Sequence, residues 1–379
     1  MNILILTHSY PDINNKWRGV FIQEQAKALC LANDITVVYF KVDYTHFAPF
    51  SKYSFHKKTE GKITVFEVTV NKSFPVITQL KYLSDTYRFI RKEILNQKRI
   101  DIIHSHLSYP AGFLGTIIQK RKNIPNVVTE HSWITRYFRS RIHKMCVLYT
   151  FKNSYCIIAV SKALREDIIK YVNHEVKIVP NVVDVEKFRI PETRKREILN
   201  IGLLGGMGNF RKGLDILLKS VSLLKNTDLL VHIGGDGIYL ETFKKMSVEL
   251  GIREKCKFYG EILPSEINNF YSGLDIYVLA SRDETFGVVI VEAMSCGLPV
   301  IATRCGGPEE IITHETGVLV EKENPDELAR AIVSVSDNLG SYDRDLIRRY
   351  ALEKYGREAF VAEITRIYQE VISASTTAR

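Results

Sequence analysis

Short apolar runs rich in Ile and Val alternate with amphipathic stretches along the first half of the chain. The apolar runs have the length of buried strands, and the amphipathic stretches have the period of helices that bury one face. The strand-like runs are residues 3–6, 35–40, 63–68, 102–104, 126–129, 156–160 and 176–179, and the helix-like stretches are residues 21–31, 80–96, 111–121 and 162–171. This alternation predicts βαβ units, and therefore a parallel sheet with helices on both faces.

The second half repeats the alternation, and a charged segment separates it from the first. Its strand-like runs are residues 199–204, 229–233, 257–259, 276–279, 299–302 and 318–320. Residues 180–198 carry two prolines and many charges without apolar periodicity, which is typical of a linker. A final amphipathic stretch, residues 357–372, follows the last predicted strand.

A chain of 379 residues is too long for one ordinary hydrophobic core. We therefore predict an α/β domain over residues 1–185, a second over residues 186–355, and a helix within residues 356–379 that packs back on the first domain. Both domains are expected to be Rossmann-like and doubly wound. Because ligands of such sheets bind at the carboxyl ends of the strands, we expect the two domains to face each other across a cleft.

The composition excludes a fibrous or largely disordered protein, since 45% hydrophobic and 25% charged residues are globular averages. The apolar residues 1–6 lack a basic leader and a cleavage site, and are interpreted as a first strand. Six cysteines without a C-x-x-C pair are typical of free thiols in a reducing compartment. These features predict a cytoplasmic protein.

Basic residues are concentrated in the first half. Residues 1–185 contain 27 Lys and Arg against 14 Asp and Glu, whereas residues 186–379 contain 25 against 29. In residues 136–144 basic and apolar side chains interleave, a pattern that suits peripheral contact with an anionic membrane. The alternative is the solvated face of an ordinary helix. Nucleic acid is not an expected partner, because no zinc finger, helix-turn-helix or RNP-like pattern accompanies the charge.

Two glutamates eight residues apart, Glu284 and Glu292, stand in an otherwise apolar stretch. A carboxylate removed from water needs a polar partner, and sugar hydroxyls are suitable partners. Between them, Phe286, Gly287 and Val288 come at the expected start of a helix, where free backbone N–H groups attract phosphate. The segment combines an anion site with two acceptors for hydroxyl groups, and a nucleoside-diphosphate sugar is the ligand hypothesis that uses both.

A glycine-rich loop, residues 202–213, follows a predicted strand and opens a helix, where glycines often cradle phosphates. Its spacing matches neither the dinucleotide nor the P-loop fingerprint. Lys212 in this loop is the natural counter-charge for a departing diphosphate, an electrostatic effect that is often the largest catalytic contribution. The alternative is a solvated lysine at a helix start.

Two further candidates follow strands of the first half. Gly19, after the first strand, permits close approach of a phosphate, although a glycine before a helix is also a common turn residue. His131 ends another strand, where it could contact a sugar hydroxyl or stabilise charge. His104 and His106 are interpreted as scaffold or acceptor-side groups. Because no third ligand completes a metal-binding spacing, we predict no metal site.

Taken in this order, the segments resemble the GT-B glycosyltransferases, specifically the large retaining family four. The resemblance spans nearly the whole chain. Its segments are Arg18-Gly19-Val20-Phe21, His104-Ser105-His106, Thr129-Glu130-His131, Val160-Ser161-Lys162, Val179-Pro180-Asn181-Val182-Val183-Asp184, Arg211-Lys212-Gly213, Glu284 to Glu292, and Gly297-Leu298-Pro299-Val300. The E-x7-E spacing with its continuation is specific. The resemblance implies the GT-B fold with a final helix that crosses back to the first domain.

The resemblance also implies a role for each matching residue. Glu284 is expected to hold hydroxyls of the donor sugar, and Glu292 the ribose hydroxyls. His131 is expected to face the donor sugar. The expected partners of the diphosphate are the amides of Phe286, Gly287 and Val288, the ammonium of Lys212 and, from the opposite domain, Gly19.

One departure from the family concerns the phosphate. The family usually places an arginine about six residues before the lysine, but this chain has Gly205-Gly206-Met207 there. Either Arg211 substitutes for that cation, or glycine amides such as that of Gly206 bind the phosphate.

The predicted activity is transfer of a glycosyl group from a UDP- or GDP-sugar to an acceptor hydroxyl, with retention of configuration and without a metal or other cofactor. Aromatic residues in 44–50 and the basic residues 136–144 suggest a lipid-linked or cell-surface glycan as the acceptor. Two alternatives stay open: a nucleotide-sugar epimerase or hydrolase that needs no acceptor, and a non-catalytic module that binds nucleotide sugars.

Overall fold

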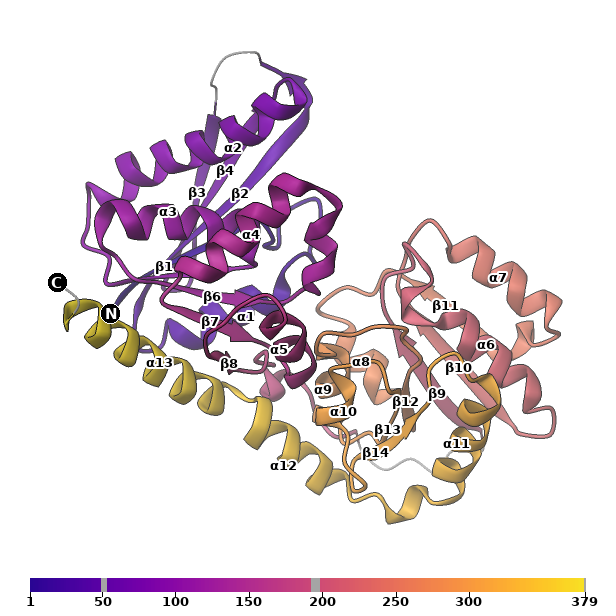
Figure 1. Ribbon diagram of the computed structural model, residues 1–379. Coiled ribbons are helices and arrows are strands. Elements are labelled where there is room, and N and C mark those ends of the chain that lie inside the picture. Colours follow the sequence, from indigo (N-terminus) through magenta and orange to yellow (C-terminus); the bar gives the residue numbers. More distant parts are fainter. Residues whose placement is uncertain (49–52, 192–197, 378–379) are drawn as a thin grey trace. The chain divides into compact units, whose positions relative to one another are not determined.

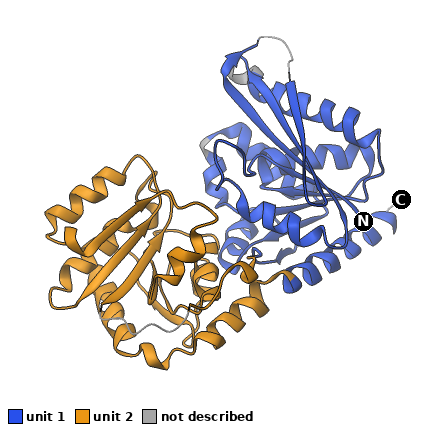
Figure 2. Cartoon of the chain, turned by 180° about the vertical axis from the view of Figure 1, so that it is seen from behind, with its two compact units in different colours: residues 1–182, 358–379 blue, residues 183–357 orange. Residues whose placement is uncertain are grey.

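A computed structural model describes residues 1–48, 53–191 and 198–377, and the chain forms two compact units. Unit 1 comprises residues 1–182 and 358–379, and unit 2 comprises residues 183–357 (Figure 2). The sequence placed these two boundaries after residues 185 and 355. Pro49 and Phe50 of the aromatic segment, and residues 192–197 of the predicted linker, lie outside the described residues.

Unit 1 is built on an eight-stranded sheet in the order β3-β4-β2-β1-β5-β6-β7-β8 (Figure 1). Its strands are β1 (Asn2–Thr7), β2 (Asp34–Phe47), β3 (Tyr53–Glu60), β4 (Ile63–Lys72), β5 (Ile102–His106), β6 (Asn126–Glu130), β7 (Cys156–Ala159) and β8 (Val176–Ile178). Neighbouring strands are parallel except β3 and β4, which are antiparallel. The predicted parallel sheet is confirmed for the other strands. The sequence did not predict β3, because this strand is polar, mostly exposed and lacks an apolar run.

Helices cover both faces of this sheet. They are α1 (Val20–Leu29), α2 (Pro75–Ile90), α3 (Phe113–Lys122), α4 (Arg141–Asn153), α5 (Lys162–Ile169) and α13 (Arg357–Thr377), with the short π-helices η1 (Arg91–Leu95) and η2 (Ser108–Gly112) and the 3-10 helix η3 (Ile134–Arg139). Successive side chains of β1 point to opposite faces. Ile3 and Ile5 therefore share a core with α1 and α13, whereas Leu4 and Leu6 share a second core with α2 and α3.

The C-terminal helix α13 belongs to the core of unit 1. Its apolar residues Phe360, Ile364, Ile367 and Val371 are buried with side chains of β1 and β2. This helix has 21 residues. Neither α13 nor any other helix in the described ranges is both long and apolar enough to span a membrane.

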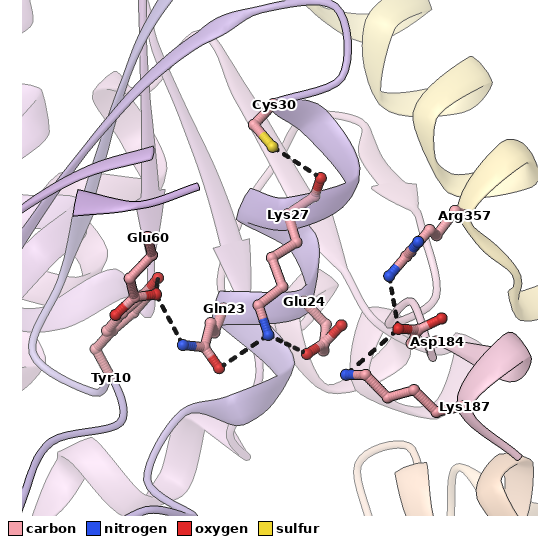
Figure 3. A network of polar contacts seen from close by, with 9 residues as sticks. All are labelled: Tyr10, Gln23, Glu24, Lys27, Cys30, Glu60, Asp184, Lys187 and Arg357. Atoms are coloured by element: carbon pink, nitrogen blue, oxygen red, sulfur yellow. Dashed lines mark hydrogen bonds and ion pairs between the residues drawn. The ribbon is translucent and has the colours of Figure 1, made fainter. Parts of the chain in front are cut away.

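Polar contacts tie α1 to the edge of the sheet in unit 1 (Figure 3). Lys27 Nζ donates hydrogen bonds to Glu24 Oε1 at 2.8 Å and to Gln23 Oε1 at 3.4 Å. Gln23 Nε2 donates in turn to Glu60 Oε2 at 2.8 Å, and Tyr10 Oη donates to the same oxygen at 3.1 Å. Glu60, at the end of β3, thus fixes both the loop after β1 and the helix that follows it.

Unit 2 is built on a six-stranded parallel sheet in the order β11-β10-β9-β12-β13-β14 (Figure 1). Its strands are β9 (Leu199–Leu204), β10 (Leu229–Gly234), β11 (Cys256–Gly260), β12 (Ile276–Leu279), β13 (Val300–Thr303) and β14 (Gly317–Val320). Strands β9 and β12 are neighbours although about 70 residues separate them. The loops that follow these two strands therefore leave the sheet side by side.

The helices of unit 2 pack on this sheet. They are α6 (Leu214–Leu223), α7 (Leu240–Glu249), α8 (Ile267–Ser272), α9 (Val288–Ser295), α10 (Pro308–Ile311), α11 (Pro325–Asp337) and α12 (Arg344–Tyr355), with turns η4 (Val185–Lys187), η5 (Phe210–Lys212), η6 (Arg253–Lys255) and η7 (Leu339–Ser341). Apolar residues of β9, β10 and β12 form one continuous core with α6, α7 and α11.

The chain enters and leaves unit 2 at adjacent points (Figure 3). Asp184 Oδ2 pairs with Arg357 Nη2 at 2.6 Å and with Lys187 Nζ at 3.4 Å. The backbone N–H of Val183 donates to the carbonyl of Tyr355 at 3.0 Å. These contacts join the first and the last residues of unit 2.

Candidate functional site

Two of the predicted site residues, Lys212 and Glu284, form an ion pair between Nζ and Oε1 in unit 2. Ser281 Oγ donates a hydrogen bond to the same carboxylate oxygen at 3.0 Å. Glu284 is 6% exposed. Burial raises the pKa of its carboxyl, but the charge of Lys212 and the hydrogen bonds from Lys212 and Ser281 outweigh this, so the pKa lies below its ordinary value. Glu284 is therefore a carboxylate at neutral pH.

A tight turn brings Lys212 to this carboxylate. Asn209 accepts a hydrogen bond from the backbone N–H of Arg211 at 2.9 Å and so caps η5. Gly213, which ends this turn, has a φ of 66° and packs against Ala280 just beyond β12. A Cβ at Gly213 would lie 1.8 Å from the carbonyl oxygen of Ala280. Only glycine permits this approach, which places Lys212 beside the loop that carries Glu284.

The backbone around Glu284 is held by a neighbouring segment, residues 305–307. The N–H of Glu284 donates to the carbonyl of Cys305 at 3.0 Å, and the N–H of Gly307 donates to the carbonyl of Glu284 at 2.8 Å. These two bonds form an isolated parallel β-bridge between Glu284 and Gly306. The loop before α9 is therefore held in place by hydrogen bonds to a neighbouring segment.

Helix α9 begins directly after this loop. Gly287 is its N-cap, with a φ of 108°. The Phe286 side chain is 2% exposed and packs edge-on against the ring of Tyr355, with centroids 5.6 Å apart. Since the first amides of a helix have no acceptor within it, the N–H groups of Gly287 and Val288 are suited to bind an anion. Phe286 can contribute only its backbone.

Glu292 lies in α9, one turn beyond these amides, and accepts a hydrogen bond from Tyr271 Oη at 2.8 Å. Its side chain is half-buried. The sequence predicted a buried carboxylate with a polar partner. The partner is a tyrosine hydroxyl from α8, and the partial exposure leaves the carboxylate accessible to a further hydroxyl.

The remaining two candidates of unit 2 are less constrained. Arg211 Nη1 lies 3.9 Å from Asp283 Oδ1, and its charge contributes to the lowered pKa of Glu284. Gly206 is exposed, and a Cβ there would have no described atom within 4 Å. Arg211 is therefore the second cation near Glu284, and there is open space at Gly206, in the segment where the resemblance led us to expect an arginine.

In unit 1, Gly19 starts α1 and requires a left-handed backbone. Its φ is 64°, and a Cβ there would lie 2.2 Å from the carbonyl oxygen of Ser9. The loop after β1 therefore folds tightly onto the start of the helix. Phe21, two residues later, packs against the ring of His131, with centroids 4.5 Å apart and the ring planes tilted by 44°. Phe21 thus connects the start of α1, where Gly19 lies, with His131.

His131 belongs to a buried group of histidines at the ends of β5 and β6. His131 Nε2 and His106 Nδ1 are 3.0 Å apart and share a hydrogen bond. Burial and the nearby His104 lower the pKa of His131 to about 3, and a hydrogen bond with Asn181 offsets this only in part. His131 is therefore a neutral imidazole at physiological pH. Asn181 was part of the motif pattern but had no predicted role.

His104 is scaffold, as the sequence suggested. Its Nε2 is 2.7 Å from Thr129 Oγ1, and its Nδ1 is 2.6 Å from Tyr368 Oη of α13. His106, by contrast, contacts a predicted site residue directly.

Sequence reasoning assigned no role to Ser281 or Tyr271, the residues whose hydroxyls hold the two glutamates. Tyr271 comes from a separate helix, and no local pattern marks it.

Within the described ranges, no group of three or more His, Cys, Asp or Glu side chains has the geometry to hold a metal ion. The polar groups gathered in unit 2 are two carboxylates, two cations and the amides at the start of α9. This set can bind an anion and several hydroxyl groups together.

Comparison with known proteins shows which families the chain is similar to. A family model described as Glycosyltransferase Family 4 matches residues 19–187, and one described as Glycosyl transferases group 1 matches residues 186–358. The chain is 29% identical over 306 residues to an uncharacterized glycosyltransferase of Methanocaldococcus jannaschii, covering 77% of this chain and 81% of that protein. It is 26% identical over 309 residues to D-inositol 3-phosphate glycosyltransferase of Corynebacterium glutamicum, covering 72% and 73%.

Solved structures share the fold. Sucrose-phosphate synthase from Thermosynechococcus elongatus superposes with a TM-score of 0.78 at 18% identity, covering 98% of this chain and 99% of that one. HepE of Anabaena, solved in complex with UDP, superposes with a TM-score of 0.74 at 18% identity, covering 98% and 100%. The two α/β units, each built on a mainly parallel sheet, therefore constitute a GT-B fold.

Proposed function

The chain belongs to the group 1 glycosyltransferases of the GT-B fold, and we propose that it transfers a sugar from a UDP- or GDP-sugar to an acceptor hydroxyl with retention of configuration. The observation that carries this proposal is the pairing of Lys212 with Glu284 beside the start of α9. UDP is the first nucleotide to test, because HepE has been solved with UDP and with UDP-glucose.

In the proposed complex, the two glutamates bind the two hydroxyl-bearing parts of the donor. Glu284 accepts hydrogen bonds from the transferred sugar, and Glu292 accepts them from the ribose. Each carboxylate already accepts a hydroxyl hydrogen bond within the protein, from Ser281 at 3.0 Å and from Tyr271 at 2.8 Å. A carboxylate that holds one hydroxyl in this geometry has further lone pairs for a second.

Lys212 and the start of α9 hold the diphosphate. The donor brings two phosphate charges, which compete with Glu284 for the ammonium of Lys212. As the bond between sugar and phosphate breaks, negative charge grows on the leaving diphosphate, and the ammonium and the amides of Gly287 and Val288 stabilise it. The scheme assigns this stabilisation to the protein alone, without a metal ion.

The acceptor hydroxyl attacks the anomeric carbon on the face that the diphosphate leaves, so the configuration is retained. The proton of this hydroxyl passes to the departing phosphate. His131 is assigned to the donor sugar. With a pKa lowered to about 3 by burial, it is neutral, and acts as a hydrogen-bonding group rather than as a positive charge.

The proposal is tested first with the donor. UDP-, GDP- and ADP-sugars are screened by thermal shift, since a ligand that binds only the folded state raises the melting temperature. The best donor is then supplied with a pool of acceptors, and the anomeric configuration of the product is read by proton NMR. Lys212→Ala and Glu284→Gln should each lower kcat by at least about 100-fold. The exposed Lys219 and Glu315 supply matched controls, Lys219→Ala and Glu315→Gln, with unchanged turnover.

Three outcomes would contradict the proposal. Turnover like that of the wild type in both site variants would remove these residues from the reaction. Complete consumption of the donor at the same rate with and without acceptor would indicate an epimerase or hydrolase. Tight donor binding without any product would indicate a binding module.

We further propose that unit 1 contacts an anionic membrane through α4, where a lipid-linked acceptor would be reached. Ile142, Met145 and Tyr149 are exposed and follow one another at helical spacing, with Arg141 and Lys144 exposed beside them. An apolar stripe flanked by basic groups suits an anionic bilayer surface. The variant Ile142→Ser/Met145→Ser should halve or abolish sedimentation with anionic liposomes. Equal sedimentation with neutral and anionic liposomes would contradict this contact.

A further inference from the structure

A cavity of about 470 Å³ lies entirely within unit 1, at the carboxyl ends of β1, β2 and β5. Its polar and aromatic lining includes His8, Ser9, Arg18, Lys41, Tyr82 and Tyr109. The volume is that of a small-molecule site, since such sites commonly span about 300–1,000 Å³. The predicted roles of Gly19 and His131 do not account for this cavity.

Among the described residues, the charged groups that line the cavity are Arg18 and Lys41, both cationic, and no carboxylate is among them. Lys41 is neutralised, because Nζ pairs with Glu67 and lies 3.2 Å from Asp12 Oδ2. Arg18 is different. Its Nη1 donates to Tyr39 Oη at 3.3 Å, and it has no ion pair within the described part of the chain. The hydrogen bond to Tyr39 and the charge of Asp12 raise the pKa of Arg18, so Asp12 balances part of this positive charge without forming an ion pair. The guanidinium therefore brings to the cavity a charged N–H donor that no carboxylate among the described residues binds directly.

His8 adds a polar group to the same lining. Its Nδ1 is buried and has no hydrogen-bond partner among the described residues. Burial and the charge of Arg18 lower the pKa of His8 to about 4, so the ring is neutral. Because a buried polar atom without a partner is costly, an unpaired ring nitrogen in a cavity wall indicates a place that a ligand or water fills.

The cavity is separate from the histidine group described above. His131 follows β6 and contacts Phe21, whereas Arg18 reaches toward Tyr39 of β2. In the strand order, β1 and β5 stand between β2 and β6. Gly19 thus lies between two polar regions of unit 1, of which only the one at His131 is assigned to the donor.

We propose that this cavity binds an anionic group of the acceptor, a phosphate or a carboxylate, and that Arg18 is the residue that selects it. The identification of the ligand as an acceptor rests on the proposed transferase function. The binding of an anion in this cavity does not. A guanidinium presents two parallel N–H groups to an oxyanion, a geometry that a neutral sugar does not use fully. His8 and the hydroxyls of the lining supply the remaining hydrogen bonds.

The site is tested on the wild-type full-length chain by arginine labelling. Phenylglyoxal modification of each arginine is followed by mass spectrometry, alone and with glycerol 3-phosphate, glycerate, or vesicles of phosphatidylcholine with phosphatidic acid. We expect at least one of these probes to slow modification of Arg18 about 5-fold or more. Arg99, whose side chain is 88% exposed, is the internal control and should react at an unchanged rate.

The probe that protects Arg18 identifies the source of the anion. Protection by glycerol 3-phosphate or glycerate indicates a soluble phosphate or carboxylate acceptor, and protection by the vesicles alone indicates a lipid head group. Protection by none of them, or equal slowing of Arg18 and Arg99, overturns the proposal.

A pair of variants gives an independent readout. Arg18→Gln should weaken binding of the protecting probe at least 10-fold, whereas Arg99→Gln should bind it as the wild type does. Melting temperatures show whether both variants fold. If Arg18→Gln does not fold, the labelling result on the wild-type chain still decides the proposal. Protection of Arg18 in a protein that turns over no nucleotide sugar would contradict the transferase and leave the anion site intact. Turnover of a nucleotide sugar without protection of Arg18 would support the transferase and overturn the anion site.

Discussion

Lys212 and Glu284 form an ion pair with each other, and Glu284 is 6% exposed. Each was predicted as a separate contact to the donor. In the structure each satisfies the other, because a buried carboxylate without a counter-charge would be costly. Under the proposed function, donor binding would therefore exchange this pair for contacts to the diphosphate and to the sugar.

Removing one partner of this pair should affect stability unequally. Lys212→Ala leaves a buried carboxylate without its counter-charge and should lower the free energy of unfolding by about 3 kcal/mol. Glu284→Gln leaves Lys212, whose side chain is 19% exposed, and should cost less because water can solvate the ammonium. Urea unfolding at pH 7 measures both, with Lys219→Ala as the control. Equal losses in the two variants would contradict the asymmetry.

The hydroxyl of Tyr271 should contribute to nucleotide binding through Glu292. Tyr271→Phe keeps the ring in its buried position but removes the 2.8 Å hydrogen bond that orients the carboxylate. We expect the Kd for the nucleotide to rise about 5-fold, the value of one hydrogen bond of about 1 kcal/mol. Calorimetric titration measures this. Tyr259→Phe, which removes a 2.7 Å contact to His232 in the same unit, is the control and should bind as the wild type does.

An arginine at position 206 should strengthen donor binding. Gly206 is exposed and has no positive φ, and a Cβ added there would have no described atom within 4 Å, so Gly206→Arg introduces neither a clash nor strain. A second phosphate contact should lower the Kd for the diphosphate about 10-fold. Gly208→Arg, at a position equally open, is the control. If both variants bind the donor alike, the added arginine acts only through its long-range positive charge and not through a direct phosphate contact. Arg211 or the backbone amides would then suffice to bind the phosphate.

Buried histidines should make unit 1 sensitive to acid. Burial lowers the pKa of His104 to about 3 and, with the charge of Arg18, that of His8 to about 4. The unfolded chain binds protons at these positions below about pH 6.5, whereas the folded chain does not. The free energy of unfolding should therefore fall as the pH decreases from about 6.5 toward 4, by up to about 1.4 kcal/mol per pH unit for each histidine.

The variant His104→Asn tests this origin of the acid sensitivity. It removes one titrating group, so the slope of unfolding free energy against pH between 6 and 4 should become shallower by about one proton. The absolute stability will also change, because the contacts to Thr129 and Tyr368 are altered. The slope, not the stability, is the measurement that decides. An unchanged slope would show that His104 titrates normally in the folded protein.

Much of the fold could be predicted from local pattern alone. Buried parallel strands such as β1 and β12 are nearly continuous apolar runs, and their residues are identifiable because both faces of the sheet are covered. The edge strand β3 was missed because it has no such apolar run: its residues are mostly exposed and polar. An edge strand is recognised by its partner β4 and not by its own composition.

The amino-acid sequence by itself determined the two α/β units and the residue types of the site, because periodicity and the spacing of Glu284 and Glu292 are properties of neighbouring residues. Only the tertiary structure decided which side chains meet. Lys212 and Glu284 are 72 positions apart, and Tyr368 and His104 are 264 positions apart. Such pairs form because the strand order and tight glycine turns bring distant loops together, and no local pattern encodes that geometry.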